Sequence, residues 1–450
     1  MNSRSIDHRP PVEAALVLHL VRSSDHGSDP SRTPRDRALR LEEAVGLAQA
    51  LDLEIREAEL VPMRAPTPAT LLGKGKVAEI GARCAADEID VVVVDDALTP
   101  IQQRNLERAW KVKVIDRTGL ILEIFGRRAR TREGRLQVEL ARLAYERSRL
   151  VKTWTHLERQ RGGLGAMSGP GETQIETDRR LLTARVKKLK LELAEVRRTR
   201  RLQRDARRRA LQPTIALVGY TNAGKSTLFN RLTEAKVEAR DMLFATLDPT
   251  VRALRLPDGR PAMLSDTVGF ISDLPHELVE AFRATLEAVR EADVIVHVRD
   301  IAGEDTEAQA RDVRKVLAEL DAGAEAGQVL IEAWNKIDVL PVEDQGVLMA
   351  RARRVKTGEP AAFPISAVTG AGTAELLQGL ADRIDSSEPV EAMLSAGDGE
   401  AMAWLYRHGR ILTREDEDDG AVRLSVRLDG QALGRFERLF PEARLRHAAE

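Results

Sequence analysis

One octapeptide constrains this chain more than any other feature of its sequence. Residues 219–226 read Gly-Tyr-Thr-Asn-Ala-Gly-Lys-Ser, the pattern G-x-x-x-x-G-K-S of a phosphate-binding loop. An apolar, β-branched run at 214–218 precedes the loop, and apolar side chains at helical spacing follow it up to residue 232. Glycines let the backbone wrap an anion, and the N-terminus of the following helix adds a positive end. A chance match in a coil would lack both flanks, so the sequence predicts a nucleotide site between a strand and a helix.

The residues of this loop have separate expected roles. We expect Gly219 and Gly224 to let the backbone curve around the phosphates. Lys225 would reach the β- and γ-phosphates, and the Ser226 hydroxyl would ligate Mg²⁺. We expect further nucleotide contacts from the rest of the loop and the first helical turn, namely Tyr220, Thr221, Asn222, Ala223 and Thr227.

A second motif, Asn-Lys-Ile-Asp at 335–338, follows a later apolar run. Asp338 can accept hydrogen bonds from the N1–H and the exocyclic amine of guanine, whereas adenine offers neither and would leave a buried charge unpaired. Ser366 and Ala367 follow the next strand-like run, where the Ala367 N–H could meet the guanine carbonyl. We therefore expect GTP or GDP as the ligand, with the base held by Asn335, Lys336, Asp338, Ser366 and Ala367.

Two segments between these motifs are expected to sense the γ-phosphate. In Asp-Thr-Val-Gly at 266–269, Asp266 would hold Mg²⁺ through water and the Gly269 N–H would contact the phosphate. An ordered loop further upstream could place the Thr246 hydroxyl on Mg²⁺ in the triphosphate state only. Thr250 is its rival, and plain loop capping is the alternative for both threonines. We assign catalysis to Lys225, Thr246 and Gly269, and further nucleotide contacts to Phe244, Ala245, Leu247, Thr267 and Val268.

Two residues bear on the rate of hydrolysis. Phe270 stands where Ras-like enzymes carry the glutamine that orients the attacking water. Asn222 resembles the residue that ligates a monovalent cation beside the phosphates in potassium-dependent GTPases of the Era-like and TrmE-like kind, and a turn-forming role would also suit it. We therefore expect slow intrinsic GTP hydrolysis that K⁺ or a partner accelerates.

Length and composition limit the class of protein. A chain of 450 residues is long enough for about three domains. No apolar run approaches the roughly 20 residues of a bilayer crossing. The N-terminus has no signal-like pattern, and Cys84 is the only cysteine. We expect a cytoplasmic monomer without stable membrane insertion, with peripheral membrane association as a lesser alternative.

The net charge of −1 hides a strong segregation of charge. Basic residues concentrate at 127–161 and 179–209, and acidic residues gather at 415–419. A solvated hairpin whose arginines pair with glutamates one helical turn away would explain any single arginine. The stripe as a whole favours salt-dependent binding to phosphates and predicts an RNA or ribosome partner.

The pattern of elements predicts a multidomain α/β protein. Alternating strand and helix patterns before residue 122 indicate a small parallel α/β domain. Periodic apolar positions at 119–160 and again from 177 indicate two antiparallel helices. A glycine-rich tip at 162–171 joins them, either as a hinge or as a loop that approaches another surface closely. The predicted order is an N-terminal ribosome-binding α/β domain, a basic helical hairpin, a Ras-like phosphate-loop GTPase domain with a mixed sheet and helices on both faces, and a small C-terminal α/β domain, at 1–122, 123–211, 212–386 and 387–450.

Several further segments resemble signatures of the HflX family of ribosome-associated GTPases. They are Leu-Gly-Lys-Gly-Lys at 72–76, Gln-Arg-Asn-Leu at 103–106, Val-Ile-Asp-Arg-Thr-Gly-Leu-Ile-Leu at 114–122, Arg-Ala-Arg-Thr at 128–131, Leu-Gln-Val-Glu-Leu at 136–140, Trp-Thr-His-Leu-Glu-Arg at 154–159 and Gly-Pro-Gly-Glu-Thr-Gln at 169–174. Some members carry an arginine just before Gly-Pro-Gly, where this chain has Ser168.

The resemblance implies docking on the large ribosomal subunit, with the glycine-rich tip near the peptidyl-transferase centre, and GTP-dependent splitting of stalled ribosomes. It also implies a secondary ATP activity of the N-terminal domain. A GTP-switched RNA-binding, RNA-modification or ribosome-assembly factor without splitting activity is the alternative. Modification GTPases of this kind have a different N-terminal domain and usually a terminal catalytic cysteine, and this chain has only Cys84.

Overall fold

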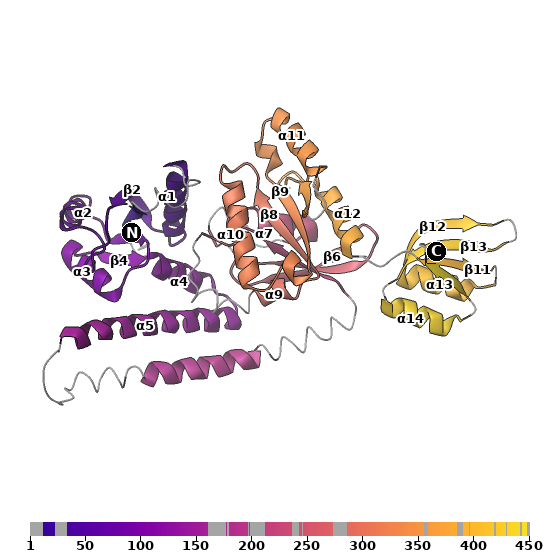
Figure 1. Ribbon diagram of the computed structural model, residues 1–450, viewed down its shortest axis with the longest axis horizontal. Coiled ribbons are helices and arrows are strands. Elements are labelled where there is room, and N and C mark those ends of the chain that lie inside the picture. The colour runs from indigo at the N-terminus through magenta and orange to yellow at the C-terminus, as the bar shows by residue number, and fades with distance from the viewer. Residues whose placement is uncertain are drawn as a thin grey trace, which may run out of the picture.

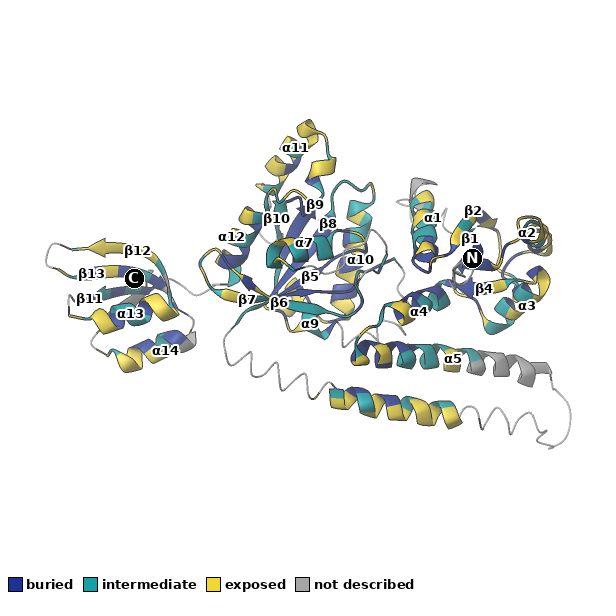
Figure 2. Ribbon diagram, turned by 180° about the vertical axis from the view of Figure 1, so that it is seen from behind, coloured by how far each residue is buried: buried dark blue, intermediate teal, exposed yellow. Residues whose placement is uncertain are grey.

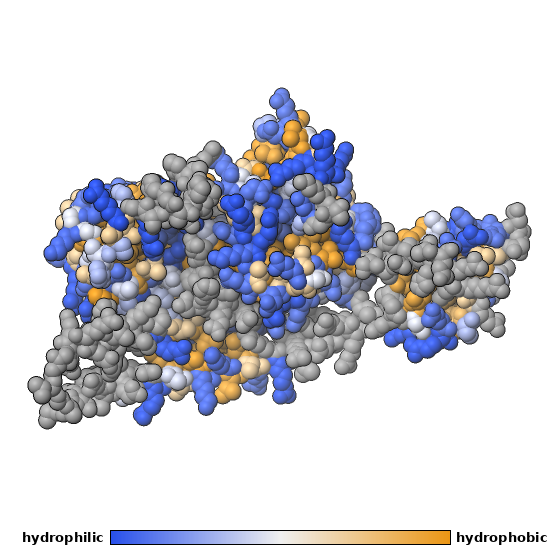
Figure 3. Space-filling model, viewed as in Figure 1, coloured by the Kyte–Doolittle hydropathy of each residue, from blue (hydrophilic) through white to orange (hydrophobic). Residues whose placement is uncertain are grey.

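The computed structural model describes residues 12–22, 34–160, 177, 180–196, 198, 212–235, 243–244, 246–272, 286–354, 359–384, 390–395, 397–417, 420–428, 430–441 and 443–447. Three sheets follow one another along the chain, and two long helices run beneath the first two sheets in Figure 1. The predicted multidomain α/β class is confirmed, while the exact domain boundaries stay a prediction. Within the described residues, no helix is both long and apolar enough to cross a membrane. Hydrophilic side chains cover much of the face seen in Figure 3.

The first sheet is parallel and has the strand order β2-β1-β3-β4. Its four valines at 91–94 are buried, which explains why this strand reads as a continuous apolar run. Helices connect the strands, as expected for parallel pairing. The elements are β1 (Ala14–Arg22), α1 (Pro34–Gln49), β2 (Glu54–Met63), α2 (Lys74–Ala86), β3 (Val91–Asp95), α3 (Pro100–Trp110), β4 (Lys113–Asp116) and α4 (Arg117–Arg128).

The helical pattern at 119–160, predicted as one helix, is two helices in the structure. α4 ends at Arg128 and α5 (Arg132–Gln160) begins after a short break. A new N-terminus forms here because Thr131 Oγ1 accepts a hydrogen bond from the Gly134 N–H at 3.0 Å. Periodicity alone missed this break, since apolar residues continue at helical spacing on both sides of it.

The basic hairpin is formed by α5 and a helix covering residues 180–196, which lie side by side in Figure 1. An ion pair between Arg185 and Glu139, at 2.6 Å, joins them. Their shared apolar seam consists of Leu136, Leu140, Leu143, Leu189, Leu193 and Val196. The glycine-rich tip predicted at 162–171 lies outside the described residues.

The second sheet has the order β10-β9-β8-β5-β7-β6, with only β6 antiparallel to its neighbour. Helices α7 and α12 pack on one face, and α9 and α10 pack on the other. Figure 2 shows the buried strands enclosed between these layers. The elements are β5 (Thr214–Val218), α7 (Lys225–Thr233), β6 (Thr250–Arg255), β7 (Pro261–Asp266), α9 (Glu287–Arg290), β8 (Val294–Asp300), α10 (Thr306–Glu319), β9 (Val329–Asn335), α11 (Val342–Ala352), β10 (Ala361–Pro364) and α12 (Thr373–Ile384).

The third sheet is antiparallel, with the order β12-β13-β11-β14 and two helices packed on its apolar face. Leu405 and Phe436 of these helices are fully buried against Leu424 and Val426. The elements are β11 (Val390–Leu394), α13 (Gly399–His408), β12 (Arg410–Asp416), β13 (Val422–Arg427), α14 (Gly430–Leu439) and β14 (Arg444–His447).

The first two sheets share one hydrophobic core. The largest apolar cluster runs from β1 and α1 through α4 into the helices on one face of the second sheet. Phe125 of α4 meets Phe244 edge to face, with ring centroids 4.7 Å apart. Phe244 is therefore held against α4 in the N-terminal part of the chain.

Candidate nucleotide site

The phosphate-loop motif lies between β5 and α7, as its sequence context predicts. Gly219 and Gly224 have φ angles of +152° and +91°. A Cβ on Gly219 would lie 2.2 Å from the Val298 carbonyl oxygen, and one on Gly224 would lie 2.2 Å from Asn335 Nδ2. Glycine is therefore required at both positions, for backbone conformation and for space.

The Lys225 side chain lies inside the loop. Its Nζ donates to the Gly219 carbonyl at 3.1 Å and to the Tyr220 carbonyl at 2.6 Å. Burial lowers the pKa of Lys225 to about 8, and the Asp266 carboxylate acts in the opposite direction. A bound anion such as a phosphate would offset this desolvation cost by stabilising the charged form of Lys225.

Three side chains predicted near Mg²⁺ are brought together at the start of α7. Ser226 Oγ lies 2.7 Å from Asp266 Oδ2 and 3.0 Å from Thr246 Oγ1. Asp266 is fully buried, its Oδ1 has no hydrogen-bond partner among the described residues, and burial raises its pKa. Two hydroxyls and an unpaired carboxylate oxygen are a donor set that suits a hard divalent cation. Thr250 instead begins β6 and pairs with Asp266 in the sheet, so Thr246 is the threonine whose hydroxyl meets Ser226.

The segment after β7 passes close beneath the phosphate loop. A Cβ on Gly269 would lie 2.8 Å from Thr221 Cγ2 and 3.1 Å from Lys225 Nζ. The Thr221 N–H donates to the Phe270 carbonyl at 2.7 Å, and the Phe270 N–H donates to the Gly219 carbonyl at 3.1 Å. The Phe270 side chain is buried in the large apolar cluster. It therefore anchors this segment and cannot act on a water molecule.

The two residues between Asp266 and Gly269 are also buried. Thr267 Oγ1 donates to the Leu217 carbonyl at 2.6 Å, which ties this segment to β5, and Val268 packs in the apolar cluster. The predicted nucleotide contact at Ala245 lies outside the described residues.

Asn335 links the phosphate loop to the predicted base-binding loop. Its Nδ2 donates to the Ala223 carbonyl at 2.8 Å, and its Oδ1 accepts from the Ala367 N–H at 2.9 Å. That N–H was expected to meet the guanine carbonyl, and here it is engaged by Asn335. The contact with the base stays a prediction.

The neighbouring residues of this motif face different surroundings. Lys336 Nζ forms an ion pair with Asp300 at 2.7 Å. The Asp338 carboxylate is exposed and has no polar partner within the described part of the chain. Ser366 is buried, and its Oγ accepts from the Thr369 N–H at 3.0 Å, which shapes the loop that precedes α12.

The N-terminal part of the chain contributes a group that motif analysis missed. Glu43 of α1 accepts hydrogen bonds from the Tyr220 hydroxyl and from Arg117, which also donates to the Ser272 carbonyl at 2.7 Å. Burial raises the pKa of Glu43. These partners are far apart in sequence, and no local pattern signals their pairing.

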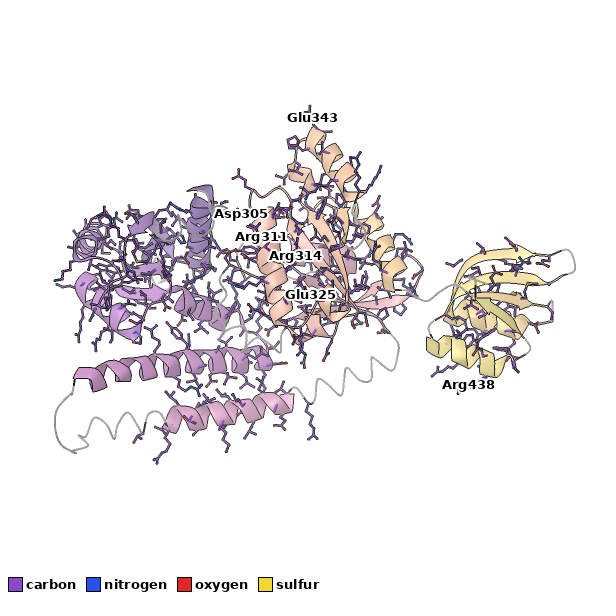
Figure 4. All side chains as sticks on the ribbon, in the orientation of Figure 1. Asp305, Arg311, Arg314, Glu325, Glu343 and Arg438 are labelled. Carbon is purple, nitrogen blue, oxygen red and sulfur yellow. The ribbon has the colours of Figure 1, made fainter. Side chains whose placement is uncertain are left out.

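A cavity of about 440 Å³ lies beside this contact, between α1, the phosphate loop and α10. Its lining carries charges of both signs, and Figure 4 shows Asp305 and Arg311 on the side of α10 that faces α1. Lining residues include Arg40, Glu43, Tyr220, Asn222, Asp305 and Arg311.

A phosphate loop at the end of a central parallel strand, a hydroxyl–carboxylate cluster beside it and a base-selecting motif two strands away define a phosphate-loop GTPase. Family models match most of the chain from residue 38 onward. They are described as GTP-binding GTPase N-terminal (residues 38–126), GTP-binding GTPase Middle Region (128–207), 50S ribosome-binding GTPase (214–336) and HflX C-terminal domain (349–447).

Two curated relatives match over nearly their full length. GTPase HflX of Magnetococcus marinus is 49% identical over 433 residues, which cover 96% of this chain and 95% of the relative. GTPase HflX of Escherichia coli is 43% identical over 417 residues, which cover 92% of this chain and 93% of the relative. The chain belongs to the HflX family of GTPases, and it is a GTP hydrolase with a GTPase domain of the ribosome-binding class.

Proposed function

We propose that this GTPase binds the large ribosomal subunit and, in its GTP state, splits or rescues stalled ribosomes. Hydrolysis to GDP and phosphate then resets it. The observation that carries the proposal is the match to HflX relatives over 96% of the chain, including the N-terminal and middle regions that precede the GTPase domain. A shared GTPase domain alone would support only a nucleotide switch.

The charge of the hairpin supports a nucleic-acid partner. Basic side chains are exposed on both of its helices, on Arg132, Arg135, Arg147, Lys187, Lys188 and Lys190. Phosphate contacts of this kind release counterions, so binding should weaken steeply as salt rises. On this proposal, ribosomal RNA near the peptidyl-transferase centre is the surface that the hairpin and its tip approach.

Sedimentation of ribosomes with the full-length protein tests this proposal. The protein loaded with a GTP analogue should convert intact ribosomes to subunits, and the GDP form should not. Intact ribosomes in both nucleotide states would exclude splitting and favour a GTP-switched assembly or RNA-binding factor. Repeating the binding at two salt concentrations tests the electrostatic contribution of the hairpin.

Deleting residues 162–171 tests the role of the tip. Splitting should be lost while affinity for GTP stays near that of the parent protein. A parallel loss of nucleotide binding would contradict the idea that the tip contacts only the ribosome.

Within the GTPase site, we infer that Lys225 contacts the β- and γ-phosphates and that Ser226 and Thr246 ligate Mg²⁺, with Asp266 acting through water. The 2.7 Å and 3.0 Å contacts of Ser226 support this set. Ser226→Ala and Thr246→Ala should each raise the Mg²⁺ concentration needed for half-maximal GTP binding. Unchanged Mg²⁺ dependence in both variants would exclude these ligands.

We infer that Asn222 ligates K⁺ beside the phosphates and that this cation accelerates hydrolysis. Asn222 is exposed with a φ of +59°, and no described residue engages its side chain. Phe270 is buried and stands in place of a glutamine that would orient water, and a cation beside the phosphates would stabilise the charge that develops during hydrolysis. Turnover should rise in K⁺ over Na⁺, and Asn222→Ala should remove the difference. Equal rates in both salts would rule out this cation.

A further inference from the structure

The loop that carries Thr246 is tied to the beginning of the hairpin. The Asp248 carboxylate accepts hydrogen bonds from the Arg130 N–H at 2.8 Å, the Thr131 N–H at 2.9 Å and the Thr131 hydroxyl at 2.5 Å. Thr131 Oγ1 in turn accepts from the Gly134 N–H. A carboxylate at a helix N-terminus is favoured by the helix dipole and by the free N–H groups there. Asp248 therefore extends the cap of α5 from a distant part of the chain.

The packing leaves little freedom in this contact. A Cβ on Gly134 would lie 2.3 Å from Asp248 Oδ1, so glycine is what allows the close approach. On the other side of Thr246, Phe244 is buried against Phe125 of α4. Phe244 is thus anchored to α4, and Asp248 is anchored to the start of α5.

These anchors determine where Thr246 can lie. Only one residue separates Thr246 from Asp248, so the two Cα atoms are at most about 7 Å apart. In this arrangement the Thr246 hydroxyl is 3.0 Å from Ser226 Oγ, at the proposed Mg²⁺ position. The anchors on α4 and α5 therefore keep the Thr246 hydroxyl beside Ser226.

We infer that Asp248 is a positioning residue for the triphosphate state, because it fixes Thr246 at the Mg²⁺ site by anchoring the loop on α5. This inference rests on the proposed role of Thr246 as an Mg²⁺ ligand. GTP benefits from a loop that is already ordered, whereas GDP does not use Thr246. The position of α5 therefore sets the preference for GTP over GDP. By linkage, a surface that holds α5 in this position raises GTP affinity, and one that displaces it lowers GTP affinity.

The test compares affinities of the full-length protein for a non-hydrolysable GTP analogue and for GDP, both with Mg²⁺. Asp248→Ala should weaken binding of the analogue about tenfold, since three hydrogen bonds to a charged group are lost. GDP affinity should stay within about twofold of the parent, because GDP makes no use of the anchored loop. Gly134→Ala, which displaces the carboxylate without removing it, should shift the ratio of the two affinities in the same direction. Asp248→Asn, which keeps one acceptor, should recover part of the loss.

Thr99→Ala is the matched control, because it removes a helix cap far from the nucleotide site. Thr99 caps α3, which packs beside the first sheet, and its Oγ1 accepts from the Gln102 N–H at 3.3 Å. It should lower thermal stability without changing the ratio of the two affinities. Equal weakening of both nucleotides in Asp248→Ala would reduce Asp248 to a structural cap and overturn the inference. Thr246→Ala separates the two claims. If it changes the ratio and Asp248→Ala does not, the anchor is excluded and the Mg²⁺ role of Thr246 survives. If neither changes it, the Mg²⁺ role fails as well.

Discussion

Replacing Asn335 by alanine should disconnect the two loops that hold opposite ends of the nucleotide. Its amide donates to the Ala223 carbonyl in the phosphate loop and accepts from the Ala367 N–H. All three residues are buried, with exposures of 2%, 1% and 3% for Asn335, Ala223 and Ala367. The substitution therefore leaves a buried carbonyl and a buried N–H without their protein partner.

The magnitude follows from the two groups left without partners. A buried polar group that loses its hydrogen bond costs about 1–3 kcal/mol, so the two together cost at least about 2 kcal/mol. If the nucleotide must restore the arrangement of both loops, this cost appears as a loss of affinity of about thirtyfold or more. GDP and GTP should be affected alike, because the Asn335 side chain contacts neither the 266–269 segment nor the loop with Thr246.

Titration with a fluorescent GDP and a fluorescent GTP analogue measures this loss. Gln328→Ala is the matched control, because Gln328 precedes the same strand β9 at its other end. Its Nε2 donates to the Val289 and Ala292 carbonyls at 2.9 Å and 2.6 Å, and its Oε1 accepts from a backbone N–H at 2.7 Å. This variant should lose thermal stability and keep its nucleotide affinity.

One result would refute the reasoning. If Asn335→Ala and Gln328→Ala lose similar stability and both bind GDP within about threefold of the parent, under 0.7 kcal/mol, the loops hold their arrangement without the bridge. Asn335 would then be an ordinary buried amide.

Three further predictions concern buried groups. Burial lowers the pKa of His297 from 6.5 to about 4. The neutral imidazole therefore contributes fully to the free energy of unfolding above pH 6.5, and this contribution is lost at up to about 1.4 kcal/mol per pH unit as the pH falls toward 4. Chemical denaturation at a series of pH values should show a weaker dependence of stability on pH for His297→Gln. Burial lowers the pKa of Lys225 to about 8, and bound phosphate should raise this pKa, so nucleotide binding should take up protons and weaken above pH 8. Calorimetry in two buffers of different ionisation enthalpy measures that uptake, and none at pH 8.5 would contradict the assignment. Gly224→Ala forces a Cβ within 2.2 Å of Asn335 Nδ2 at a φ of +91°, which should cost about 1–3 kcal/mol in denaturation experiments.

Some features of this protein were readable from the sequence because they depend on neighbours along the chain. The phosphate loop requires glycines at fixed spacing between a strand and a helix, and Gly219 and Gly224 have positive φ angles that glycine adopts readily. The strand β3, with its run of valines, and the strand β9, which ends at Asn335, were predicted because each is a local apolar run. The class of protein and its guanine-nucleotide ligand followed from these local patterns.

Other features were decided only by tertiary structure. The break between α4 and α5 lies within an uninterrupted helical periodicity, and Asp248, distant in sequence, completes the cap at Thr131. The hydrogen bond between Glu43 and Tyr220 likewise joins residues far apart in the chain. Such contacts arise where the first two sheets share one apolar core, and hydrophobic burial that fixes this packing has no directional signature in the sequence.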